Sequence, residues 1–212
     1  MGRVKAVLQS EFPYNISARC INREWFELPM VEVWQVFEDE LARTCEKHNL
    51  EIHSFVLMSN HFHLLASTPK SNISQCMQQF MHRSSRQLTK RGNRINETFA
   101  GRHYKCVMHE PNYFLNAYKY VYRNPVQAGL CARVEEYPFS TLKAVRGELN
   151  VKFPLQEDTT YLTDPEGTLE WLNATPDKAK FEAFRCGTHR SFFESKKHKH
   201  TNRPILGQHD LL

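Results

Sequence analysis

The sequence contains no apolar run approaching the roughly 20 residues that a membrane-spanning helix needs. Its first ten residues, MGRVKAVLQS, lack the apolar stretch of a secretory signal peptide. Glycine and proline number only 8 and 10, while aromatic residues reach 12%, which is too many for a disordered chain. These features exclude the membrane, fibrous and secreted classes. We therefore expect a cytoplasmic protein without a membrane partner.

The cysteine pattern is equally restrictive. The six cysteines, at positions 20, 45, 76, 106, 131 and 186, form no C-x-x-C pair. A zinc ribbon and a thioredoxin-type redox motif are thereby excluded. We expect reduced thiols that pack as small hydrophobic side chains.

The chain length sets the domain organisation. With 212 residues, the sequence is long enough for one domain of about 150 residues plus an extension. The hydrophobic pattern weakens after Gly147. We therefore predict a domain over residues 1–150 and a C-terminal extension over residues 151–212, whose role the sequence leaves open.

Positive charge is concentrated in the middle of the chain. Residues 70–123 carry ten basic and two acidic side chains, whereas residues 1–69 carry six basic and nine acidic ones. A solvated helix face would usually mix both signs, and a concentrated basic stretch is the electrostatic footprint of a polyanion-binding protein. The charge pattern therefore favours a nucleic-acid partner.

The hydrophobic periodicity and turn residues predict an alternation of strands and helices. We expect strands over 12–18, 51–58, 61–67 and 99–108, helices over 29–49, 71–90 and 111–123, a short helix from residue 137, and one modest helix around 165–185. Ser59-Asn60 predicts a hairpin turn, and Asn124-Pro125 is expected to stop the third helix. This order fits an α+β fold, in which helices back an antiparallel sheet in a split β-α-β arrangement.

Two histidines stand out on the second strand of the predicted hairpin. Side chains alternate across a sheet, so His61 and His63 share one face while Phe62 points to the other. Two imidazoles at this spacing can bind one metal ion. The pair alone does not distinguish a metal site from a chance or structural pair.

A second group of residues lies on the third predicted helix. Tyr120 and Asn124 are four residues apart and therefore share a face. A tyrosine hydroxyl there can attack phosphorus, and an amide oxygen one turn later can complete a metal site. The alternative is a core tyrosine followed by an Asn-Pro helix stop.

Together these segments resemble a known family. The runs LMSNHFHLLAS, FAGRHYKCVM, YKYVYRNPVQAGL and EEYPFSTLKAVRG have the order and spacing of the single-tyrosine HUH transposases, close to the REP-associated tyrosine transposases. The resemblance spans about residues 10–147. Gln127 replaces an arginine often seen in the family's N-P-V-R-A-G run, which affects no catalytic group.

The resemblance implies a ferredoxin-like, RRM-like sheet and an enzyme of DNA transposition. Tyr120 would be the nucleophile, and His61, His63 and Asn124 would bind a divalent ion, Mg²⁺ or Mn²⁺. These ligand types alone do not exclude Zn²⁺. The enzyme would cut and rejoin single-stranded or hairpin DNA through a 5′-phosphotyrosine, in the cytoplasm at the nucleoid, as a monomer or a homodimer. Tyr118 and Tyr122 each lie about 200° from Tyr120 around the helix axis, so they cannot share the face on which Tyr120 and Asn124 lie.

The basic residues are predicted to hold the DNA backbone. These candidates are Arg83, Arg86, Lys90, Arg91, Arg94, Arg102 and Lys105. His53 and His103 are either further site residues or packed histidines. The run KKHKH at 196–200 is either a DNA contact or a solvated terminus.

Three other functions compete with this one. An RRM-like binding module would stack bases on Phe62 and Tyr104 without chemistry. An inactivated relative would keep DNA binding alone, although His61, His63, Tyr120 and Asn124 are all present. A zinc hydrolase is disfavoured because the chain has no H-E-x-x-H motif and no carboxylate near the H-x-H pair.

Overall fold

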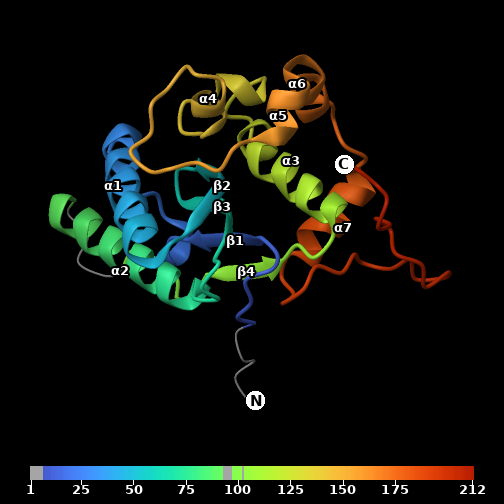
Figure 1. Cartoon of the computed structure of the whole chain (residues 1–212), viewed down its shortest axis with the longest axis horizontal. Helices are drawn as coiled ribbons and strands as arrows, with labels where there is room; N and C mark the ends of the chain where they lie inside the picture. Colours follow the sequence, from blue (N-terminus) through green and yellow to red (C-terminus); the bar gives the residue numbers. More distant parts are fainter. Residues whose placement is uncertain (1–6, 93–96, 102) are drawn as a thin grey trace.

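The computed structural model describes residues 7–92, 97–101 and 103–212 (Figure 1). In chain order, its strands and α-helices are β1 (Tyr14–Arg19), α1 (Met30–His48), β2 (Glu51–Leu57), β3 (His61–Ser67), α2 (Ile73–Arg91), β4 (Tyr104–Val107), α3 (Pro111–Gln127), α4 (Leu142–Val145), α5 (Thr159–Thr163), α6 (Pro165–Asn173) and α7 (Lys178–Gly187). Two short 3₁₀ helices, Ile21–Arg23 and Val134–Glu136, lie between them.

The four strands form one antiparallel sheet in the order β2-β3-β1-β4. The predicted hairpin is present: Met58 N donates to His61 O (2.8 Å) across Ser59-Asn60. β1 pairs with both β3 and β4, so the first strand lies inside the sheet. The predicted α+β fold is confirmed.

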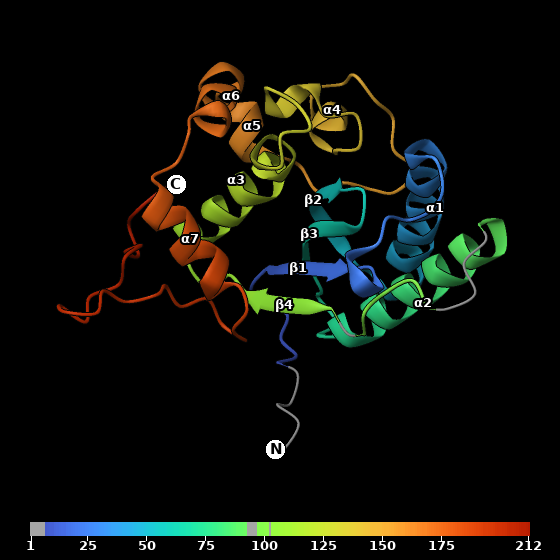
Figure 2. The same cartoon turned by 180° about the vertical axis from the view of Figure 1, so that it is seen from behind.

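Helices cover both faces of this sheet. Figures 1 and 2 show α1 and α2 on one side and α3 on the other. On β3, Phe62 is fully buried and packs edge-to-face on Phe37 of α1 and Phe80 of α2, with ring centroids 5.9 and 5.3 Å apart. Leu65 belongs to the core around α3 instead. Strand alternation therefore directs His61 and His63 toward α3, as the sequence predicts.

The predicted end of the third helix is wrong, because α3 continues through Pro125 to Gln127. Proline lacks an N–H, so only the bond that residue 125 would donate is lost. The final turn still closes: Ala128 N donates to Asn124 O (3.0 Å) and Leu130 N to Pro125 O (2.9 Å). Asn124 consequently lies within the helix, one full turn after Tyr120.

Other boundaries also differ from the prediction. β4 is shorter than expected, although Phe99 forms an isolated bridge with Cys20. The short helix predicted from residue 137 begins later, as α4 at Leu142, because residues 139–141 bond to the edge of β2 instead. Leu57 N donates to Phe139 O (3.0 Å), and Thr141 N donates to Phe55 O (2.9 Å).

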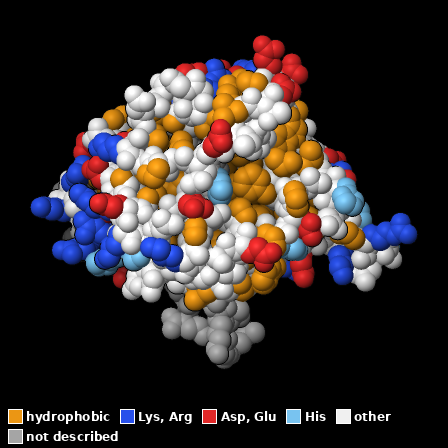
Figure 3. Space-filling model, in the orientation of Figure 1, with side chains coloured by type: hydrophobic (Ala, Val, Ile, Leu, Met, Phe, Trp, Pro, Cys, Tyr) orange, Lys and Arg blue, Asp and Glu red, His pale blue; other side chains and the backbone are white. Residues whose placement is uncertain are grey.

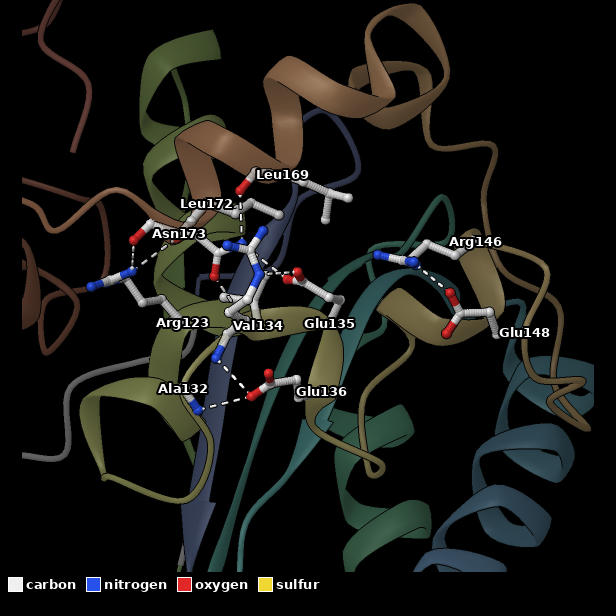
Figure 4. Close-up of polar contacts among 11 residues, drawn as sticks. Arg123, Ala132, Val134, Glu135, Glu136, Arg146, Glu148, Leu169, Leu172 and Asn173 are labelled. Carbon is white, nitrogen blue, oxygen red and sulfur yellow. Dashed lines mark hydrogen bonds and ion pairs between the residues drawn. The ribbon is translucent and has the colours of Figure 1, made fainter.

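The C-terminal extension contains three helices instead of one, and it packs on α3. Arg123 donates to the backbone oxygens of Leu172 (3.1 Å) and Asn173 (2.6 Å), as Figure 4 shows. Lys119, only 2% exposed, donates to Leu212 O (2.7 Å). The core around α3 thus includes residues from both sides of the predicted boundary at residue 150, which stays a prediction.

Two expectations about composition can be compared with the model. All six cysteines are free; Cys20, Cys45, Cys76 and Cys106 are buried, and Cys131 and Cys186 are half-buried. Across the ranges that the structure describes, no helix combines the length and apolar character needed to cross a membrane.

Candidate active site

The two histidines of the H-x-H pair lie together beneath α3. Their ring centroids are 5.0 Å apart on β3. β1 runs alongside, with Ser17 opposite His63 and Arg19 opposite His61. The histidine pair therefore lies inside the sheet rather than at its edge, on strands held from both sides.

Hydrogen bonding leaves ring nitrogens of both histidines available. His61 Nδ1 lies 2.7 Å from Asn60 Oδ1. Because an amide oxygen only accepts, Nδ1 carries the proton and Nε2 keeps its lone pair. His63 is buried, and neither of its ring nitrogens has a hydrogen-bond partner among the described residues. A buried polar atom without a partner is costly, which indicates that a ligand belongs there.

Helix α3 brings Tyr120 to this histidine pair. The Tyr120 and His63 rings meet edge-to-face, with centroids 5.5 Å apart. Asn124 follows one turn later, where its Nδ2 donates to Tyr120 O (2.6 Å) and its Oδ1 accepts no protein hydrogen bond among the described residues. The structure thus brings Tyr120 to His63 and places Asn124 next along the same helix.

The neighbouring tyrosines lie elsewhere. The Tyr118 hydroxyl donates to Asp158 (2.7 Å), and the Tyr122 hydroxyl lies 3.2 Å from Thr141 Oγ1. Both rings are buried, at 1% exposure each, and contact one another with centroids 4.8 Å apart. Each hydroxyl has a structural partner, so neither is positioned beside the histidines.

The electrostatics of the site favour neutral imidazoles. Burial lowers the pKa of His61 to about 4, and the nearby Arg19 charge contributes to this shift. Burial, His61 and Arg19 hold the pKa of His63 well below its usual range. Both rings are therefore neutral at pH 7, the state in which imidazole binds a metal ion.

Tyr120 is shielded from solvent by the extension. Its ring is 8% exposed and packs against Phe181 and Phe184 of α7, with centroids 5.5 and 5.3 Å away. Burial raises the pKa of Tyr120, while the positive charges of Arg185 and Arg19 act in the opposite direction. Sequence reasoning missed all four of these residues: Arg19 has no motif around it, and α7 lies outside the recognised segments.

The donors present suit a divalent ion. Among the described residues, no three His, Cys, Asp or Glu side chains come close enough together to form a metal site. A site here would therefore use the two neutral imidazoles with the amide oxygen of Asn124. Such a set leaves the charge of the ion uncompensated, which favours an anionic ligand such as a phosphodiester.

The predicted DNA-binding residues differ in their contacts. Arg86, Lys90 and Arg91 are exposed along α2. Arg83 instead forms an ion pair with buried Glu40 of α1 (2.6 Å), and Lys105 donates to Ser74 of α2 (3.0 Å). Arg94 and Arg102 lie outside the described residues.

Helix α2 approaches the site around the end of β1. Thr98 N donates to Ser85 Oγ of α2 (3.3 Å), and Ala100 N donates to Arg19 O (2.9 Å). Arg19 lies opposite His61. The basic helix therefore covers the opposite face of the sheet but is linked to the end at which His61 lies.

Two of the alternatives left open by the sequence can be compared with the geometry. His53 is packed: its Nε2 lies 2.8 Å from Ser67 Oγ, and its ring contacts Phe114 at 5.5 Å. His103 is half-buried immediately before β4. Phe62 is inaccessible in the core, so a binding module that stacks bases on Phe62 is wrong.

One solved structure shares the fold of this chain. A solved structure of a REP-associated tyrosine transposase bound to a REP hairpin superposes with a TM-score of 0.60 at 16% identity, over 74% of this chain and 93% of that one. A putative transposase from Deinococcus radiodurans R1 gives a TM-score of 0.38 at 13% identity, over 70% of this chain and 98% of that one. No curated protein matches the chain.

The sequence itself matches a family model. That model is described as "Transposase IS200 like", and it matches residues 15–125. The matched segment is just over half of the chain, and it contains both the histidine pair and Tyr120 with Asn124. The chain therefore belongs to the IS200-like transposase family.

Proposed function

We propose that this protein is a metal-dependent single-stranded DNA endonuclease and strand transferase that acts through Tyr120. The observation that carries the proposal is the buried His63, whose two unpartnered ring nitrogens lie beside the ring of Tyr120. A potential nucleophile and an unsatisfied metal-binding group share one enclosed site. A core tyrosine beside a structural histidine would not leave both ring nitrogens without partners.

The reaction is a transesterification at phosphorus. The Tyr120 hydroxyl oxygen attacks the scissile phosphate, the bond from phosphorus to the 3′-oxygen breaks, and the leaving oxygen takes a proton. The products are a 5′-phosphotyrosine and a free 3′-hydroxyl. Because the phosphoryl bond is conserved, attack by another 3′-hydroxyl releases Tyr120 and rejoins DNA without a nucleotide cofactor.

His61, His63 and Asn124 would hold a divalent ion, Mg²⁺ or Mn²⁺, which polarises a phosphate oxygen and orients the phosphate when bound. His61 is oriented for this role by its bond to Asn60, a typical arrangement behind a metal-binding imidazole. Arg19 and Arg185 add positive charge that offsets part of the rise in the Tyr120 pKa caused by burial. The residues of this chain thus supply ligands, orientation and charge around the nucleophile.

The substrate proposed is single-stranded or hairpin DNA. The exposed Arg86, Lys90 and Arg91 would neutralise backbone phosphates. Figure 3 shows Lys and Arg side chains gathered at the left edge of the molecule, where Figure 1 shows α1 and α2. The similar solved structure was bound to a REP hairpin, which supports a structured DNA end as substrate.

A covalent-adduct assay tests the proposal. The full chain is incubated with a labelled single-stranded oligonucleotide that carries a hairpin, with Mn²⁺ or with excess chelator. We expect a DNA-protein band that survives denaturation only with the metal. Mass spectrometry should place the phosphotyrosine on the peptide that contains Tyr120.

The outcomes distinguish the competing functions. A non-catalytic binding protein shifts the DNA in a native gel and forms no adduct under any condition. An adduct that forms equally well in chelator contradicts the metal dependence, and one that maps to another residue contradicts the role of Tyr120.

A further inference from the structure

We propose that β4 and the C-terminal extension form a second DNA-binding surface that stacks unpaired bases next to the active site. It consists of a stacking ledge (Tyr104, His109, His189 and Phe192) and a basic tip (residues 196–203). The proposal rests on the proposed function for the identity of the nucleic acid as DNA. The family resemblance, which ends near residue 147, does not cover the extension.

The ledge is built by adding a segment to the sheet. Phe192 forms a parallel bridge with Val107 of β4. Val107 N donates to Ser191 O (2.9 Å), and Phe193 N donates to Val107 O (3.0 Å). This pairing covers the edge of β4, and the short addition fixes the aromatic side chains of both segments relative to one another.

The rings of the ledge form two edge-to-face pairs. Tyr104 contacts His189 with ring centroids 5.0 Å apart, and His109 contacts Phe192 at 5.8 Å. Tyr104 is 58% exposed and Phe192 is 43% exposed. These are two of the few large apolar side chains that the described protein leaves in solvent, and they lie along one edge.

The neighbouring Phe193 shows what a purely structural aromatic residue does at this position. It is 1% exposed and packs on Phe184 and Tyr113, with centroids 4.9 and 4.6 Å away. The core therefore uses Phe193 and leaves Phe192 outside. An exposed aromatic ring held on a fixed backbone is the feature that proteins use to stack bases of single strands.

Tyr104 lies on the same face of the sheet as the histidines, whereas Phe192 is in register with Val107 and lies on the opposite face, so the ledge follows the outer edge of β4 from one face to the other. Ser17 of β1 is opposite His63 on one side and opposite Tyr104 on the other. Residues in register share a face, so His63, Ser17 and Tyr104 form one row across three strands. With strands about 4.8 Å apart, Tyr104 lies roughly 10 Å from His63. Nucleotides that flank a phosphate at Tyr120 can therefore reach the ledge at Tyr104, and a longer flank can follow the edge of β4 to Phe192.

The basic tip supplies the complementary charge. Residues 196–203 contain three lysines, one arginine and two histidines, with no acidic residue. The sequence left open whether this run is frayed. It forms a closed turn, in which His198 N donates to Arg203 O (2.8 Å) and Ile205 N donates to Lys196 O (2.8 Å). Figures 1 and 2 show the segment projecting away from the sheet, and Figure 3 shows basic side chains on that projection.

Binding is measured by fluorescence anisotropy in chelator with the Tyr120→Phe protein, so that no cleavage interferes. The probes are a hairpin with an unpaired oligothymidine flank and the same hairpin without a flank. We expect Tyr104→Ala and Phe192→Ala each to weaken binding of the flanked hairpin by between about 5-fold and about 150-fold, the loss of one stacked base. The unflanked hairpin should bind these variants as it binds the parent. Leu130→Ala and Leu162→Ala, at side chains 51% and 56% exposed, are the matched controls.

The tip is tested by salt dependence. Replacing Lys196, Lys197 and Lys199 by Ala should reduce the slope of log affinity against log salt by about two if all three contact phosphates. A triple variant of Arg133, Lys143 and Lys152, which removes the same charge elsewhere, should leave the slope unchanged.

The results separate this proposal from the proposed function. If the ledge variants bind the flanked hairpin more weakly but the unsubstituted protein forms no covalent adduct in the cleavage assay, the ledge is supported and the proposed enzyme activity is contradicted. Unchanged binding by Tyr104→Ala and Phe192→Ala overturns the ledge, whatever the cleavage activity. Tighter binding of an RNA flank of equal length overturns the assignment to DNA. In addition, 5-iodouracil in the flank should photocrosslink to a ledge peptide, and crosslinks confined to α2 would overturn the placement.

Discussion

Substitutions at three tyrosines of α3, Tyr118, Tyr120 and Tyr122, should affect activity and stability separately. Tyr120→Phe removes only the hydroxyl, which interacts with the half-buried amide side chain of Asn124 and not with a charged group, so the fold should keep nearly all of its stability while cleavage is abolished. Tyr118→Phe removes a donor to Asp158 at 2.7 Å, and Asp158 also caps α5 through Tyr161 N. A hydrogen bond to a charged group contributes about 1.5–3 kcal/mol.

The size of the stability effect follows from the chain length. For a protein of about 200 residues, 1 kcal/mol corresponds to about 2–4 °C in Tm, so Tyr118→Phe should lower Tm by about 3–12 °C. Tyr122→Phe loses a contact between neutral hydroxyls, which predicts a loss of about 0.5–1.5 kcal/mol. Both variants should still form the adduct.

The assay combines thermal melting with the denaturing gel on the same four proteins. Our expectation is that Tyr120→Phe has the same melting temperature as the parent protein and forms no adduct, while Tyr118→Phe melts at a lower temperature and forms the adduct. An adduct with Tyr120→Phe, or a complete loss of cleavage by Tyr118→Phe below its melting temperature, would refute it.

Three further predictions follow from the same geometry. His61→Ala or His63→Ala should abolish both the adduct and Mn²⁺ binding measured by titration calorimetry, and full activity in excess chelator would contradict this. Burial lowers the pKa of His53 to about 4 in the folded protein. Between pH 6.5 and pH 4 the unfolded chain therefore binds a proton at His53 that the folded protein does not bind. The free energy of unfolding, measured in urea, should fall as the pH falls through that window. His53→Gln should reduce that fall, and an unchanged pH profile would show that His53 does not cause it. Replacing Arg86, Lys90 and Arg91 by Ala should weaken hairpin binding and reduce its salt slope by about two, whereas the Arg133, Lys143 and Lys152 variant should not.

The sequence predicted the sheet and its three long helices because strong periodicity and turn residues marked them. Ser59-Asn60 defined the hairpin, and strand alternation alone placed His61 and His63 on one face. The site was also predictable in part, since helical spacing separates Tyr120 from Tyr118 and Tyr122. These are local rules, and local rules need only neighbouring residues.

The features that could not be predicted depend on distant contacts. Pro125 is a strong local stop signal, but α3 is packed on both sides and loses only one hydrogen bond. Nothing near Arg83 indicates that Glu40, 43 residues earlier, will bind it. The cover over Tyr120 comes from Phe181 and Phe184 in a segment whose helices are short and whose pattern is weak.

The anchoring of α3 by the extension has a consequence for the timing of folding during synthesis. The outer side of α3 is fixed by Leu172, Asn173 and Leu212, all of which leave the ribosome after it. At about 5–20 residues per second, the interval from Asn124 to Leu212 lasts about 4–18 s. During that interval the sheet and the helix can form, but the contacts that fix the outside of α3 are missing. A nascent chain should therefore acquire its complete site only after residues 172, 173 and 212 have left the ribosome.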